Sequence, residues 1–73
     1  MMPQCMRIIL NGETREVMQG CTVATLLSEL ALQDDRVAVE LNLTIVERGA
    51  FASATLHEDD RVEVIGFIGG GEE

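Results

Sequence analysis

The sequence contains no lysine, no tryptophan and no tyrosine, and its only aromatic residues are Phe51 and Phe67. Without lysine, the N-terminal amine is the only amine open to acylation, so one copy cannot be conjugated to a lysine of another. Two phenyl rings do not form the row of aromatic side chains on which nucleic-acid bases stack. Strong bases are scarce as well: five arginines stand against 13 acidic residues, giving a net charge of −8. This balance argues against nucleic acid as a partner and favours another protein.

Long apolar runs and cysteine pairs are also missing. No stretch reaches the roughly 20 apolar residues that cross a bilayer, and MMPQCMRIIL lacks the features of a signal peptide. We therefore expect a cytoplasmic protein with no membrane partner. Cys5 and Cys21 form neither a C-x-x-C motif nor a disulfide framework, so we expect reduced thiols that pack in the core or at a strand edge. A persulfide on one of them is the alternative.

What is present is the composition of a small globular protein, with 47% hydrophobic and 25% charged residues in 73. A chain of this length forms one domain and buries only about 60% of the surface of its unfolded state. His57 has no cysteine, histidine or aspartate at a metal-ligand spacing, so HEDD is interpreted as a solvated turn and no metal site is expected. Neither a catalytic triad nor a phosphate-binding loop is present, so we do not expect an enzyme.

The first half of the chain predicts a hairpin followed by one helix. Residues 5–10 are apolar and rich in β-formers, and they stop at Asn11-Gly12, a dipeptide typical of tight hairpin turns, before a return strand at residues 14–17. Thr22 is a candidate N-cap, and the next apolar residues repeat at helical spacing: Val23, Leu26, Leu27 and Leu30. Polar residues 33–35 are expected to end this helix, which packs on one face of a sheet.

The second half predicts three more strands. VAVELN alternates from Val37, a short strand is expected at residues 44–46, residues 47–60 read as a loop with one helical turn, and a last strand spans residues 61–65. The order ββαβββ predicts an α+β domain of the ubiquitin-like β-grasp type, with one main helix on a mixed sheet of four to five strands. This domain is expected to span residues 1–66, with residues 67–73 as a flexible glycine-rich tail.

The tail GFIGGGEE is the feature that points to function. A glycine run adds nothing to a core, but it can enter a narrow channel because the walls approach the backbone closely. Residues 67–71, fully extended, would reach about 17 Å into a partner enzyme while the folded body stays outside. The alternative is an end with no role.

From Arg7 to Gly71 the chain resembles the ThiS family of sulfur carrier proteins in thiamine biosynthesis. The matching segments are RIILNGE, TVATLLSEL, VAVELN with IVER, EDDRVEVI and GFIGGG. The resemblance implies that Gly71 carries sulfur as a thiocarboxylate, with Gly69 and Gly70 as the approach into partner active sites. It also implies partners: a ThiF-like enzyme that adenylates Gly71 with ATP and magnesium, a persulfide donor such as a cysteine desulfurase, and a ThiG-like thiazole synthase. The chain itself would bind no cofactor.

The sequence departs from the family at its end, because Glu72 and Glu73 follow Gly71 in peptide linkage. A peptide carbonyl cannot be adenylated. Either a processing peptidase removes the two glutamates, or they are foreign to the natural chain, or the chain is a non-carrier derivative; removal is the preferred reading. We expect the mature end to be Gly71, with Gly70 as the alternative. Leu43 and Asp59 depart from turn glycines of the family.

Two alternatives remain for function and one for the tail's first residues. A carrier for another pathway, similar to MoaD, shares the same tail, and a β-grasp interaction module would not use Gly71 at all. Phe67 and Ile68 are large apolar residues at the root of the tail. We expect them to contact the partner, while completion of the domain's own core by Phe67 is the alternative.

Overall fold

The computed structural model describes residues 4–66, and it contains a five-stranded sheet, one α-helix and two short 3-10 helices. The predicted order ββαβββ is confirmed. The predicted glycine-rich tail, residues 67–73, lies outside the described residues. In chain order the elements are β1 (Cys5–Leu10), β2 (Glu13–Met18), α1 (Val23–Glu29), η1 (Asp34–Arg36), β3 (Val37–Leu41), β4 (Thr44–Val46), η2 (Arg48–Ala50) and β5 (Arg61–Gly66).

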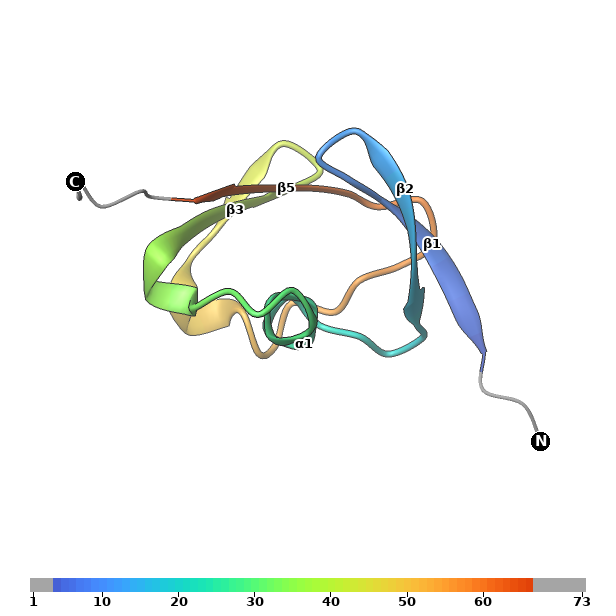
Figure 1. Cartoon of the computed structure of the whole chain (residues 1–73), viewed down its shortest axis with the longest axis horizontal. Coiled ribbons are helices and arrows are strands. Elements are labelled where there is room, and N and C mark those ends of the chain that lie inside the picture. Colours follow the sequence, from blue (N-terminus) through green and yellow to red (C-terminus); the bar gives the residue numbers. More distant parts are fainter. Residues whose placement is uncertain (1–3, 67–73) are drawn as a thin grey trace.

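The sheet has the strand order β2-β1-β5-β3-β4, so the last strand of the chain lies at its centre. β5 runs parallel to β1 and antiparallel to β3, and the two outer pairs are antiparallel hairpins. The sheet is therefore mixed, as predicted. In Figure 1 it lies on one side of the molecule and α1, seen nearly end-on, lies on the other. β5 ends at the side of the molecule opposite to the start of β1.

Both hairpins close with two residues of positive φ, which is the geometry of a type I′ turn. Asn11 and Gly12 have φ of 51° and 83°, and Asn42 and Leu43 have φ of 52° and 70°. Asparagine tolerates this region because of its short polar side chain, and glycine has no Cβ to clash. Leu43 has neither advantage, yet it adopts the same conformation.

The helix begins as predicted but ends earlier. Thr22 is its N-cap and accepts a hydrogen bond from the Thr25 N–H at 3.2 Å. The prediction that residues 33–35 end it is wrong, since α1 stops at Glu29 and residues 34–36 form η1. The cause is a Schellman motif: Ala31 has φ of 60°, its N–H donates to the Ser28 carbonyl, and the Leu32 N–H donates to the Leu27 carbonyl.

The core lies between α1 and the sheet. Its members are Met6, Ile8, Val17, Cys21, Val23, Leu26, Leu27, Val37, Val39, Phe51, Leu56 and Val62. Phe51 and Leu56 belong to the segment between β4 and β5, which the sequence indicated only as a loop with one helical turn. The turn is η2. Two backbone hydrogen bonds hold the segment to α1: the Val23 N–H donates to the Ala54 carbonyl, and the Ala24 N–H donates to the Phe51 carbonyl. None of the helices described is long and apolar enough to cross a membrane.

Candidate functional site

The described part of the candidate site is the end of β5, from which the chain continues toward the glycine run. The predicted sulfur-carrying Gly71, the approach residues Gly69 and Gly70, the contact residues Phe67 and Ile68, and the extension Glu72-Glu73 all lie outside the described residues. On one side β5 is paired with β3 up to its last residue, where Gly66 faces Val37. The end of β5 is therefore anchored to the sheet by main-chain pairing with β3.

On its other side, β5 is held by a side chain. β1 pairs with β5 only at Ile9–Arg61 and Leu10–Val62, because the chain turns away at Asn11. Past that point Asn11 bonds to Val64: its Oδ1 accepts from the Val64 N–H at 2.8 Å and its Nδ2 donates to the Val64 carbonyl at 3.3 Å. Sequence analysis identified Asn11 as a turn residue and missed this contact, which no spacing rule indicates.

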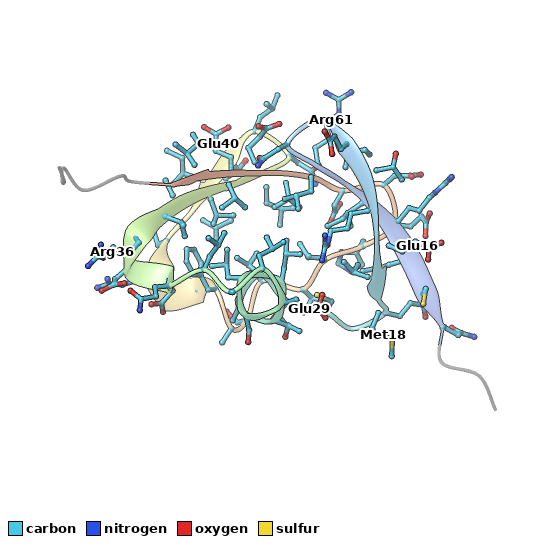
Figure 2. The ribbon with its side chains drawn as sticks, in the orientation of Figure 1. Glu16, Met18, Glu29, Arg36, Glu40 and Arg61 are labelled. Carbon is cyan, nitrogen blue, oxygen red and sulfur yellow. The ribbon has the colours of Figure 1, made fainter. Side chains whose placement is uncertain are left out.

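The face of the sheet opposite α1 carries exposed apolar residues on β5 and β4. Ile65, next to the end of β5, is 54% exposed, and Ile45, which pairs with Glu40, is 71% exposed. Leu43 is 85% exposed in the β3–β4 turn, which lies at the start of β5. Glu40 and Glu63 face each other across β3 and β5, and Figure 2 shows Glu40 and Arg61 on the side of the sheet away from the helix. Ile65 shares a face with Glu63 by alternation, which is the signal that sequence analysis could have used. We refer to Ile45 and Ile65 as the outer apolar residues.

Charged groups of the described region form few close pairs. Arg7 Nε lies 3.7 Å from Glu58 Oε2, and His57 Nδ1 lies 3.8 Å from Asp60 Oδ2. The first pair is more than half exposed, so it adds little stability. Among residues 4–66 no group of three or more His, Cys, Asp and Glu side chains is placed to hold a metal ion, and no pocket is present.

The two cysteines differ in environment. Cys5 is exposed on β1, whereas Cys21 is buried in the core with its thiol 3.4 Å from the Thr22 carbonyl oxygen. Burial, with a smaller contribution from Glu29, raises the pKa of the Cys21 thiol. The predicted core packing is confirmed for Cys21. A raised pKa removes the thiolate that nucleophilic sulfur chemistry needs, so Cys21 is unsuited to receive a persulfide.

Comparison with known proteins identifies the family. The model of the ThiS family matches residues 8–71, which is most of the chain and ends at the last residue of the glycine run. The chain belongs to the ThiS family. The resemblance to this family that the sequence indicated is confirmed.

Solved structures of the ThiS family share the fold. The crystal structure of the thiamine biosynthesis protein ThiS from Geobacter metallireducens matches with a TM-score of 0.77 and 39% identity, covering 90% of this chain and 100% of that one. A solution structure of a thiamine biosynthesis protein from the same organism matches with a TM-score of 0.76 and 38% identity, covering 93% and 91%. The ThiS-like β-grasp fold is confirmed.

Curated relatives include much longer proteins. A thiazole synthase of Paramagnetospirillum magneticum is 40% identical over 68 residues, and one of Magnetococcus marinus is 45% identical over 67. These alignments cover 93% and 92% of this chain, which spans only 21% of the length of each thiazole synthase. The uncharacterized protein ycf40 of Porphyra purpurea is 33% identical over 64 residues, covering 88% of this chain and 90% of that protein.

Proposed function

We propose that this chain carries sulfur as a thiocarboxylate on Gly71 and donates it to the thiazole ring of thiamine. The observation that carries the proposal is the family match, which begins at Ile8 in β1, includes the glycine run and stops at Gly71. The site at the end of β5 supports it. A carrier whose reacting atom must reach into other enzymes needs a stable folded domain and a terminal segment without large side chains. β5, which leads to the glycine run, is the central strand of the sheet in that domain.

The chemistry of loading explains why partners are needed. A carboxylate is a poor acylating agent, since its charge is delocalised and oxide is a poor leaving group. A ThiF-like enzyme with ATP and magnesium would join the Gly71 carboxylate to AMP and release pyrophosphate. A persulfide sulfur, from a donor such as a cysteine desulfurase, would then attack the carbonyl carbon and expel AMP. Reductive cleavage of the resulting acyl disulfide by a thiol would leave the thiocarboxylate on Gly71, and the chain would supply only this reacting end.

Loading requires a free carboxylate at Gly71, whereas Glu72 follows it in the sequence. We propose that a peptidase hydrolyses the Gly71–Glu72 bond and removes Glu72-Glu73 before activation. The unprocessed chain would then be a blocked carrier, because Gly71 in peptide linkage has no free carboxylate to attack the α-phosphate of ATP.

A ThiG-like thiazole synthase is the proposed acceptor. Segments similar to this chain form about a fifth of two proteins named thiazole synthase, so a segment like this chain is joined to the rest of a thiazole synthase there. Phe67 and Ile68, together with the outer apolar residue Ile65, would contact the partner. Burial of one such side chain contributes about 1.5 to 3 kcal/mol.

The other readings are less well supported. The ThiS match favours thiamine over a MoaD-like pathway. A β-grasp interaction module that never activates Gly71 is favoured by a single observation, the two glutamates that follow it. The two readings differ in what the chain carries in the cell.

The deciding experiment is the intact mass of the untagged chain purified from its own host. We expect loss of Glu72 and Glu73 and, in a fraction of molecules, replacement of one terminal oxygen by sulfur. A matched control is a chain truncated after Gly70, which should stay free of sulfur if Gly71 is the site. A wild-type population that retains both glutamates and carries no sulfur would contradict the carrier function and support the interaction module.

A further inference from the structure

The central strand β5 is held unevenly along its length. β3 pairs with it from Leu41–Val62 to Val37–Gly66, over five positions, but β1 pairs at two positions only. The half of β5 nearest the glycine run therefore has a backbone partner on one side and would be an open edge on the other. An edge of this kind allows a strand to tilt, because hydrogen bonds restrain it from one side alone.

Asn11 replaces the missing strand at that edge. A carboxamide has the same donor and acceptor as a peptide group, and both are used on one residue: Oδ1 with the Val64 N–H and Nδ2 with the Val64 carbonyl. The Asn11 backbone N–H also donates to the Val62 carbonyl at 2.9 Å. Asn11 thus extends the β1 edge by one position and reaches to two residues before Gly66.

Asn42 provides a matched case at the start of β5. It occupies the same position of the other type I′ turn, with φ of 52° against 51° for Asn11. Its side chain also makes two hydrogen bonds, accepting from the Arg61 N–H at 2.9 Å and donating to Asp60 Oδ1 at 3.1 Å. The chain therefore holds β5 with two asparagine amides, one near its start and one near its end.

We infer that Asn11 is a positioning residue for the carrier reaction, because its amide fixes the direction in which the chain leaves the sheet at Gly66. This inference rests on the proposed function. A tilt of about 20° at Gly66 would displace the far end of a five-residue extended segment, about 17 Å long, by about 6 Å. A partner active site tolerates far smaller errors in the position of a reacting group. Without the Asn11 amide, the direction of the chain after Gly66 would vary more between molecules. A smaller fraction of the docked molecules would then react.

The test compares Asn11→Gly with Asn42→Gly in chains that end at Gly71. Glycine keeps each turn, since it adopts positive φ freely, and each variant loses two side-chain hydrogen bonds. The measurement is ATP–pyrophosphate exchange with the ThiF-like enzyme of the same organism, which gives kcat and KM for the carrier. Faster exchange of the Val64 amide proton in Asn11→Gly verifies that the contact is lost.

We expect Asn11→Gly to lower kcat at least about fivefold with KM within about twofold of wild type, because the outer face still docks while the end is misdirected. Asn42→Gly should keep the wild-type kcat at a similar loss of thermal stability. Equal kcat values for the two variants would overturn the inference. So would a rise in KM for Asn11→Gly with kcat unchanged. A wild-type chain ending at Gly71 that supports no exchange would instead contradict the proposed function, and the inference with it.

Discussion

The carboxylate of Asp60 joins the β3–β4 turn to the segment before β5, because its Oδ1 accepts from Asn42 Nδ2 at 3.1 Å. The other oxygen, Oδ2, accepts from the His57 N–H at 2.7 Å. Both oxygens are thus used, and the Asp60 side chain is only 14% exposed. It holds the chain at the point where it enters the centre of the sheet.

We expect Asp60→Asn to lower the free energy of unfolding by about 1 to 2 kcal/mol. Both carboxylate oxygens accept a hydrogen bond, whereas the NH₂ group of asparagine cannot accept one, so one of the two bonds is lost. Urea denaturation checks this. The matched control is Asp59→Asn, which removes the same charge from an exposed neighbour whose side chain makes no hydrogen bond or ion pair among residues 4–66. Equal losses for the two variants would show that charge, rather than hydrogen bonding, sets the effect.

Leu43 should be replaceable by glycine with a gain in stability. Its φ of 70° lies in the left-handed region, where the Cβ of a leucine is strained. Its side chain is 85% exposed, so little packing offsets this strain. We expect Leu43→Gly to raise the free energy of unfolding by about 1 kcal/mol. Gly12 holds the same position of the other hairpin, where φ is 83°, and Gly12→Ala should lower it by a similar amount. A loss of stability in Leu43→Gly would mean that the leucine packs in a way its exposure does not indicate.

Cys21 should make the protein less stable at alkaline pH. Burial raises its pKa in the folded state above the ordinary value of 9.0. Above pH 9.0 the unfolded chain therefore releases the proton while the folded chain keeps it, so the free energy of unfolding falls as pH rises. The sequence has no lysine or tyrosine, the side chains that would otherwise dominate the pH dependence of stability in this range.

Thermal unfolding between pH 8 and 11 measures this slope. Cys21→Ala should flatten it, whereas Cys5→Ala, at the exposed site, should leave it unchanged. A slope that persists in Cys21→Ala would assign the alkaline sensitivity to another group.

Ile65 should matter for partner binding more than for folding. It is 54% exposed on the outer face of β5 and directly precedes Gly66. We expect Ile65→Thr to weaken binding to the ThiG-like thiazole synthase about tenfold, the loss of roughly 1.4 kcal/mol of buried apolar surface, with little change in melting temperature. Met18 is 47% exposed at the end of β2, on the side of the molecule away from the end of β5, as Figure 2 shows. Met18→Thr should leave the affinity unchanged, and calorimetric titration of both variants decides the point.

The strands were predictable because their signals are local. Alternation located β3 and β5 to within a residue, and Asn11-Gly12 located the first turn. The end of α1 was not predictable, since Ala31 takes the left-handed position that glycine normally marks. Because this position is usually glycine, a Schellman motif that has alanine there cannot be recognised from the sequence.

Contacts between distant segments were missed for a different reason. Phe51 and Leu56 lie in a segment without periodicity, so nothing in their spacing indicates burial, yet they are 3% and 1% exposed. The contact of Asn11 with Val64 joins residues 53 apart and depends on where β1 stops pairing. Such contacts follow from the topology of the sheet, which the sequence predicted only as a mixed arrangement with the last strand included.

The central place of β5 also has a mechanical consequence. A force applied to the chain at Gly66 along the strand is resisted by the hydrogen bonds to β3 on one side and by those to β1 and Asn11 on the other. These bonds are loaded together in shear instead of opening one after another, as they would at an edge hairpin. If a partner enzyme drew in the end of this protein, as proposed, it would therefore pull on a strand that is hydrogen-bonded on both sides, and several of these bonds would have to break at once.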